Sequence, residues 1–189
     1  MLRLATAAFV AAVALAAAPT AGAYPTSFDF AKGSNLWSTL TITWQQLPGH
    51  YSTLSWRAGS GVSTDSCWPA HGWLPNGWYD LWGHWNNYDA TIKGRVWYLQ
   101  NKQCWNGTWR GELFVHSEET ASNGQYCPTS GDDPYCWEGD HDYYSAGCIK
   151  VAHAGPIPTD IGQVHTAWHE KSGDTRHGSF GIGGWMYVH

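Results

Sequence analysis

The sequence predicts a mainly β domain, either a sandwich or a compact barrel, with about one helix near its C-terminal end. Short stretches that alternate apolar and polar side chains, rich in β-branched and aromatic residues, recur along the chain. Gly, Pro and Asn separate these stretches, and only one segment carries apolar residues at helical spacing. Many short strands joined by such turns are typical of sandwiches and barrels.

The N-terminal segment is typical of a secretory signal peptide. Residues 1–23 contain a basic Arg3, an uninterrupted apolar run over 7–18, and small residues before the expected cleavage point. The run is shorter than the about 20 apolar residues of a membrane-spanning helix, and no second run of that length follows. We therefore expect an exported protein without a membrane span after cleavage, secreted or associated with the cell wall. Residues 24–35 are predicted as a weakly structured lead-in and 36–189 as one domain.

Seven stretches after the lead-in fit strands, and one fits a helix. The predicted strands are 36–44, 51–61, 77–84, 94–101, 111–117, 147–152 and 183–189, with 45–50 as the turn between the first two. The predicted helix covers 159–171, which opens on two possible capping residues and carries Ile161, Val164, Ala167 and Trp168 at helical spacing.

The charge balance argues against a nucleic-acid partner. Removing residues 1–23 leaves 9 basic and 15 acidic side chains, whereas nucleic-acid phosphates require a basic face. Peptidoglycan, which carries amines of its own, stays compatible with this balance.

The five cysteines imply two disulfides and one unpaired thiol, because exported proteins meet an oxidising compartment. Cys127 and Cys136 flank a Pro-, Gly- and Asp-rich loop and form the natural short-range pair. Cys67 and Cys104 then close a longer loop, and Cys148 is left over. From spacing alone, Cys148 can be either a nucleophile or an inert buried thiol.

A nucleophilic cysteine needs a base, because its ordinary pKa of about 8.5 leaves few thiolates at neutral pH. His116 ends the apolar stretch "LFV", where a packed strand end can hold an imidazole. Cys148 follows Gly147 and precedes another apolar stretch. A turn built on Ser145 and Gly147 can expose backbone N–H groups toward a developing oxyanion. These are the parts of a Cys–His acyl-transfer site.

The stretches "FVHSEE" and "SAGCIKV" resemble the L,D-transpeptidase catalytic domain (YkuD) family, whose signature is a His at a strand end followed downstream by a Ser-x-Gly-Cys turn. Upstream, "LTITWQQL", "LSWRAGSG" and "WLPNGWYDL" are similar to the family's opening hairpin and to its Pro-Gly-Tyr segment. The resemblance covers about residues 36–152, and its most specific part is the cysteine turn together with His116 and Ser117.

The resemblance implies a mixed β-sandwich in which Cys148 is the nucleophile and His116 the base. Ser145 and Gly147 would shape the turn, the amides of Gly147 and Cys148 would form the oxyanion hole, and Ser117 would orient the histidine. The implied substrate is a peptidoglycan stem peptide, cleaved between an L-centre and a D-amino acid. An amine acceptor or water then resolves the thioester. The resemblance implies no metal and no organic cofactor.

The sequence departs from the family pattern at three points. Ala146 stands where the family usually has His, and Lys150 stands where Arg or Asn is common. The interval from His116 to Cys148 is 32 residues, longer than the pattern leads us to expect. We interpret the additional residues, 118–144, as an insertion that a disulfide between Cys127 and Cys136 closes. Such an insertion would form a lid or an altered substrate groove.

Other histidines compete with His116 for the role of base. His141 lies between Asp140 and Asp142, which favour its charged form and suit an ion-pair partner. A papain-like or NlpC-type peptidase would instead use His165 or His169, downstream of the cysteine. The i, i+4 spacing of that last pair also fits a zinc site, but without an evident third ligand we interpret them as surface histidines.

The acidic residues of the insertion and the many tryptophans each have a structural and a functional interpretation. Five acidic residues near the insertion could in principle bind calcium but lack an ordered loop signature, so a solvated loop is favoured: Asp132, Asp133, Glu138, Asp140 and Asp142. The 14 tryptophans suggest either core filling or stacking on sugar rings. We expect most of them in the core and a few along a groove. A non-catalytic wall- or glycan-binding domain is therefore the alternative function.

Overall fold

The computed structural model describes residues 26–128, 133–155, 158–172, 179–180 and 183–189. The predicted signal peptide, residues 1–23, lies outside the described residues. Among the described helices, none has both the length and the apolar character needed to cross a membrane.

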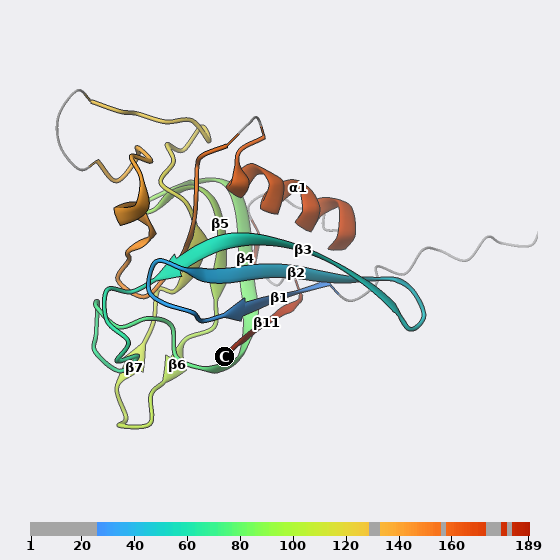
Figure 1. The fold of residues 1–189 in the computed structure, drawn as a ribbon, viewed down its shortest axis with the longest axis horizontal. Coiled ribbons are helices and arrows are strands. Elements are labelled where there is room, and N and C mark those ends of the chain that lie inside the picture. The colour runs from blue at the N-terminus through green and yellow to red at the C-terminus, as the bar shows by residue number, and fades with distance from the viewer. Residues whose placement is uncertain (1–25, 129–132, 156–157, 173–178, 181–182) are drawn as a thin grey trace, which may run out of the picture.

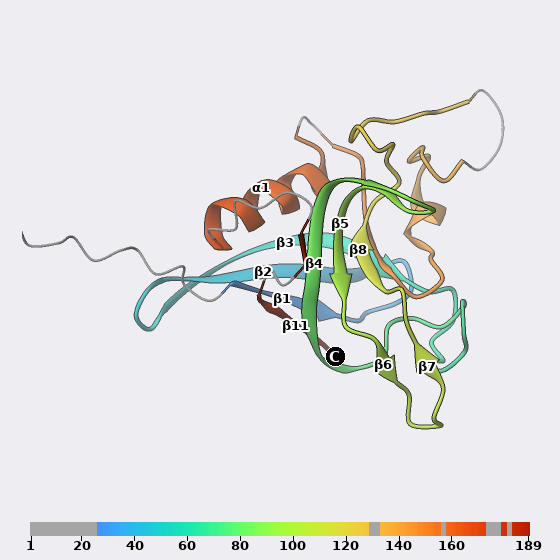
Figure 2. The same cartoon turned by 180° about the vertical axis from the view of Figure 1, so that it is seen from behind.

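Eight strands form a closed barrel in the order β4, β11, β1, β2, β3, β9, β8, β5, and β5 pairs again with β4 (Figures 1 and 2). Their bounds are β1 Thr26–Ala31, β2 Ser38–Leu47, β3 His50–Ser60, β4 Gly77–Asp89, β5 Lys93–Leu99, β8 Phe114–His116, β9 Ile149–Val151 and β11 Trp185–Val188. The pairs β1–β11 and β8–β9 are parallel, and the other barrel pairs are antiparallel. The predicted mainly β fold is confirmed as a barrel, and each predicted strand overlaps an observed one.

Smaller elements lie outside the barrel wall. They are the hairpin of β6 Lys102–Gln103 and β7 Trp109–Arg110, the 3-10 helix η1 Asp140–Tyr143, and β10 Ser179–Phe180, which pairs with β4. The predicted turn over residues 45–50 is shorter than expected, because β2 runs to Leu47 and β3 begins at His50.

The segment predicted as a weakly structured lead-in, residues 24–35, contains a central barrel strand, so this prediction is wrong. β1 lies between β2 and β11, and its Phe28 and Phe30 are fully buried. Their alternation with Asp29 is the period-2 signal of a half-buried strand. The domain therefore starts no later than Thr26.

One α-helix is present in the described part of the chain, α1 Asp160–Ser172, which confirms the prediction over 159–171. It packs its apolar face on the barrel through fully buried Ile161 and Val164 and through Trp168, which is 1% exposed. The Trp168 ring stacks on Phe28 at 5.0 Å between centroids. The helix thus closes one side of the barrel core (Figure 1).

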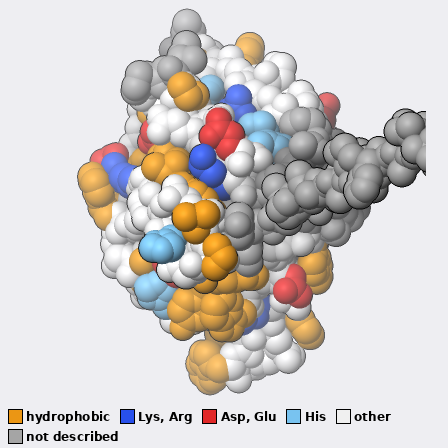
Figure 3. Space-filling view, turned by 90° about the vertical axis from the view of Figure 1, so that its right-hand side faces the viewer, with side chains coloured by type: hydrophobic (Ala, Val, Ile, Leu, Met, Phe, Trp, Pro, Cys, Tyr) orange, Lys and Arg blue, Asp and Glu red, His pale blue; other side chains and the backbone are white. Residues whose placement is uncertain are grey.

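The tryptophans are mostly not core residues, contrary to the expectation. Of the 14, four are buried, Trp44, Trp56, Trp97 and Trp168. The others are half-buried or exposed, and Trp105 is 90% exposed. Figure 3 shows hydrophobic side chains gathered on the lower part of one face. The barrel interior has room for few indoles, so the rest cover its outside.

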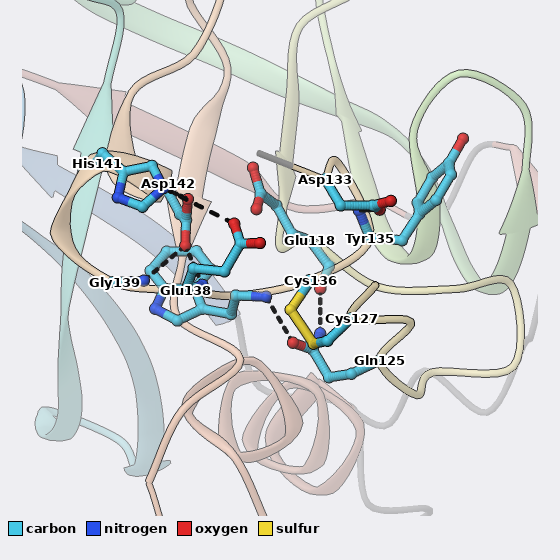
Figure 4. The surroundings of a disulfide bond; sticks show 11 residues. Glu118, Gln125, Cys127, Asp133, Tyr135, Cys136, Glu138, Gly139, His141 and Asp142 are labelled. Carbon is cyan, nitrogen blue, oxygen red and sulfur yellow. Dashed lines mark hydrogen bonds and ion pairs between the residues drawn. A yellow bond between two sulfur atoms is a disulfide. The ribbon is translucent and has the colours of Figure 1, made fainter. Parts of the chain in front are cut away.

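The described residues of the predicted insertion, 118–128 and 133–144, project from one end of the barrel (Figures 1 and 2), and the predicted Cys127–Cys136 disulfide joins these two parts. Gln125 ties the loop together, because its amide nitrogen donates to the carbonyl of Glu118 and its amide oxygen accepts from the Trp137 backbone N–H at 2.6 Å (Figure 4).

The second predicted disulfide is not formed in the structure. Cys67 and Cys104 are free, buried thiols that line one cavity. Cys104 Sγ also donates to the Ser66 carbonyl at 3.3 Å. The two sulfurs are therefore neighbours, as the sequence predicts, but reduced.

Candidate active site

Cys148 and His116 lie on neighbouring parallel strands and face the same side of the barrel wall. In β8, Val115 belongs to the barrel core, so Phe114 and His116 alternate to the outer face. In β9, Ile149 is a core residue, and Cys148 just before it packs with Phe114 on the outer face. The register pairs Val115 with Ile149. His116 pairs with Lys150, so the cysteine lies two residues along the ladder from the partner of the histidine.

A cavity of about 240 Å³ is lined by both Cys148 and His116. Ser117, Ser145 and Lys150 also line it. Cys148 also lines a second cavity, described below. The other candidate bases, His141, His165 and His169, line neither of the two cavities. Of the candidate bases, only His116 therefore shares a cavity with the thiol within the described residues.

Cys148 also lines a larger cavity, of about 450 Å³, whose walls are largely aromatic. Trp85, Tyr88, Tyr98 and Phe114 contribute to it. Cys148 therefore lies between two cavities, one shared with His116 and one with largely aromatic walls.

The Ser145 hydroxyl organises the cysteine turn as predicted. It donates to the Cys148 carbonyl at 2.6 Å and accepts from the backbone N–H groups of Gly61, at 2.9 Å, and Gly147, at 3.1 Å. Ser60, which is fully buried, adds a hydrogen bond from its hydroxyl to the Gly147 carbonyl at 3.2 Å. The hydroxyls of Ser145 and Ser60 together hydrogen-bond to four backbone groups in and next to the cysteine turn.

The backbone N–H of Gly147 donates a hydrogen bond to the Ser145 hydroxyl in the structure. To contribute to an oxyanion hole, the Gly147 N–H must therefore break its hydrogen bond to the Ser145 hydroxyl when substrate binds.

Arg110 donates a hydrogen bond to the cysteine turn, through the Ala146 carbonyl. No sequence pattern predicts this residue as part of the site. Its guanidinium is 3% exposed and donates to the carbonyls of Ser66, of Gly72 at 2.9 Å and of Ala146 at 3.1 Å. Gly147 has φ +118, and a Cβ there would lie 2.1 Å from Arg110 Nη2. The glycine of the turn is thus required by backbone conformation and by the arginine packed against it.

The thiol and the imidazole are both neutral in the resting structure. Burial raises the pKa of Cys148 to about 11, although a backbone hydrogen bond from Phe114 and the charge of Lys150 oppose the shift. Burial and the charge of Lys150 lower the pKa of His116 to about 3. At neutral pH the cavity is therefore lined by an uncharged thiol, which donates to the Glu112 carbonyl at 3.6 Å, and by an uncharged imidazole, which can accept a proton.

Ser117 orients His116 through its backbone rather than through its hydroxyl. His116 Nδ1 lies 2.8 Å from the Ser117 carbonyl, which can only accept, so Nδ1 carries the proton. The lone pair is then on Nε2, the nitrogen available as a base. The contact between Ser117 and the histidine is thus made by a main-chain oxygen and not by the hydroxyl.

Lys150 and Glu118 form an ion pair at the wall of the smaller cavity, with side chains 13% and 8% exposed. Breaking a buried pair of this kind by removing one partner leaves an uncompensated charge. The pair ties the first residues of the insertion to β9, next to the cysteine turn.

The remaining acidic and histidine candidates belong to the loop itself. His141 Nε2 lies 2.9 Å from an Asp142 carboxylate oxygen and 3.7 Å from one of Glu138 (Figure 4). Asp140 pairs with Arg57 at 2.7 Å, and Asp133 accepts from the Tyr135 backbone N–H at 2.9 Å. Asp132 lies outside the described residues. These contacts match the ion-pair interpretation of His141, but Asp142 is 2% exposed, so the interpretation of a solvated loop is wrong for this residue.

Comparison with known proteins adds no family assignment: the chain matches no protein-family model, and no curated protein matches it.

Proposed function

We propose that this protein is an exported cysteine-nucleophile acyltransferase that acts on peptidoglycan stem peptides, as an L,D-transpeptidase or L,D-carboxypeptidase. One observation carries the proposal: a free cysteine and a neutral histidine line one cavity, on adjacent strands, beside a turn fixed by buried polar groups. The motif resemblance of "FVHSEE" and "SAGCIKV" supplies the reaction class.

In the acylation step, Cys148 Sγ attacks the carbonyl carbon of the scissile peptide bond while His116 Nε2 takes the thiol proton. Because the resting thiol is uncharged, deprotonation accompanies attack instead of preceding it. The imidazolium then returns the proton to the departing nitrogen of the D-residue. The C–N bond breaks, a thioester forms, and His116 is neutral again.

In the second step an amine or water attacks the thioester carbonyl. His116 accepts the proton of this nucleophile and gives it to the departing Cys148 sulfur, so the free thiol is restored. An amine yields a cross-link and water yields a shortened stem peptide. Ala146 and the aromatic cavity beside Cys148 leave room for the acyl donor.

The reaction is tested on purified muropeptides with tetrapeptide stems, by mass spectrometry of the products. The wild type should release one terminal D-amino acid per stem, and a carbapenem should add the mass of one β-lactam to the protein. Cys148→Ser should show neither. His116→Gln should lose at least about 100-fold in rate, while the matched control His141→Gln should keep it. Turnover in Cys148→Ser, or neither turnover nor acylation in the wild type, contradicts the proposal.

A wall- or glycan-binding role without catalysis is the second candidate, favoured by an exposed aromatic row on β4 and β11. Trp78 is 57% exposed and Trp185 is 39% exposed, and their rings lie 4.7 Å apart. Tyr187 continues the row at 4.6 Å from Trp78. Exposed aromatic faces of this kind stack on sugar rings. If binding is the function, the double variant Trp78→Ala with Trp185→Ala should no longer sediment with isolated cell wall. The wild type should show no turnover, and Cys148→Ser should bind cell wall as well as the wild type does.

A further inference from the structure

Three histidines from two elements meet on the side of the barrel that α1 covers. His84 lies in β4 and is fully buried, whereas His165 and His169 lie one turn apart on α1 and are half-buried. One ring nitrogen from each histidine lies within 4.8 Å of those of the other two. Figure 2 shows α1 beside the upper part of β4. The third ligand that the i, i+4 pair lacked in the sequence is thus supplied by a strand about 80 residues away.

The spacing of the nitrogens is close to that of a tetrahedral metal site. Zinc binds imidazole nitrogen at about 2.0–2.1 Å, which places neighbouring ligand atoms about 3.3 Å apart. His165 Nε2 and His169 Nε2 are 3.1 Å apart. The ring centroids of His84 lie 5.3 Å from His165 and 4.9 Å from His169. Small rotations of the rings can therefore direct three nitrogens at one ion.

Aromatic packing holds the site together from the barrel side. The His84 ring stacks on Trp97 at 4.8 Å between centroids with an angle of 19°. Trp97 itself is fully buried and packs edge-on against Trp168 of α1 at 6.4 Å. The position of His84 relative to α1 is therefore fixed by the core, which pre-organises the ligand set.

The ligand chemistry selects the class of metal. Among the described residues, this cluster contains three imidazoles and no carboxylate or thiol. Nitrogen donors of this type suit Zn²⁺, Cu²⁺ and Ni²⁺, whereas Ca²⁺ and Mg²⁺ prefer oxygen.

We propose that His84, His165 and His169 form a binding site for one divalent transition-metal ion, zinc above all, which fastens α1 to β4. The site is separate from the cysteine site, because His84 packs into the core while the adjacent Trp85 packs with the outer cluster around Cys148. It therefore does not depend on the proposed acyltransferase function.

The test uses the mature protein with a purification tag that contains no histidine, stripped of metal with a chelator and titrated with ZnCl₂. The wild type should bind one ion per chain by isothermal titration calorimetry. At zinc 100-fold above the dissociation constant its Tm should rise by at least about 5 °C. His165→Ala and His169→Ala, both at half-buried helix positions, should weaken binding at least about tenfold and lose the Tm shift. His50→Ala, at an exposed position in β3, is the matched control and should behave like the wild type.

Free thiols are the competing ligands, and cobalt distinguishes them. The Co²⁺-loaded protein should show the visible ligand-field bands of low-coordinate cobalt without a thiolate charge-transfer band, and Cys148→Ser should leave the spectrum unchanged. The proposal is overturned if no ion binds at one per chain, if the thiolate band appears, or if His165→Ala and His169→Ala bind zinc as the wild type does. In that case the 3.1 Å contact is an N–H···N hydrogen bond between two imidazoles.

Discussion

The Ser145 hydroxyl and the Cys148 carbonyl are joined by a 2.6 Å hydrogen bond that closes the turn carrying the sulfur. The same hydroxyl accepts two backbone N–H groups, so it links the cysteine turn to the end of β3 through Gly61. The orientation of the sulfur toward the cavity that it shares with His116 therefore depends on a residue three positions upstream.

Replacing Ser145 by Ala should therefore loosen the cysteine turn. Two partly buried N–H groups lose their acceptor, which should lower the free energy of unfolding by about 1–3 kcal/mol. The rate of D-amino-acid release should fall more than stability alone explains, measured at a temperature where the variant is folded. Ser122→Ala, which removes an exposed hydroxyl, is the control and should change neither quantity. Equal behaviour of the two variants would show that Ser145 has no positioning role.

Gly147→Ala should be more disruptive than another glycine replacement at positive φ. Its Cβ would meet Arg110 Nη2 at 2.1 Å, whereas a Cβ at Gly49, with φ +80, has no heavy atom within 4 Å. Gly49→Ala therefore reports the cost of backbone conformation, about 1–2 kcal/mol. Denaturant unfolding should show a larger loss for Gly147→Ala, because buried Arg110 must also move. A smaller loss than in Gly49→Ala would refute the role given to the arginine.

Burial of His116 as a neutral imidazole should make the protein acid-sensitive. Its pKa is about 3 in the folded chain and about 6.5 when unfolded. Between these values the unfolded chain binds the additional proton, so stability should fall as pH drops from about 6.5 toward 3 and should be unaffected by this group above pH 7. His116→Gln should reduce the slope of unfolding free energy against pH in this window. The exposed His50→Gln should keep the slope, and a slope unchanged in both variants would contradict the shift.

Reactivity of Cys148 should rise with pH in the absence of substrate. Because burial raises its pKa to about 11, the thiolate fraction should increase about tenfold per pH unit between pH 7 and 10. Iodoacetamide labelling followed by peptide mass spectrometry gives the rate for this one cysteine. Labelling that is already maximal at pH 7 would instead indicate a thiolate–imidazolium pair.

Mild oxidation should join Cys67 and Cys104, which are free thiols that line one cavity. The count of titratable thiols should drop from three to one, with the loss of two hydrogen masses, and Cys148 should be the thiol that remains. Closing the loop between them should stabilise the fold by about 4 kcal/mol, on a chain-entropy estimate. Cys67→Ser, in which the partner is absent, should show neither change, and a wild type that keeps three thiols would refute the pairing.

Local patterns in the sequence predict most of the secondary structure. Period-2 alternation predicted the strands, and helical spacing predicted α1 within one residue at each end. The Cys127–Cys136 disulfide was predictable, because these two cysteines flank a turn-forming loop. Even the strand that we missed, β1, carries its signal in the alternation of Phe28 and Phe30.

Which distant residues meet depends on the three-dimensional fold. The pairing of β8 with β9 brings His116 to Cys148, and Arg110 reaches the cysteine turn from β7. The closure of α1 on β4 turns two histidines on a helix into a cluster of three. These juxtapositions depend on strand order and barrel closure, which follow from burying the whole apolar surface at once. No local periodicity encodes them.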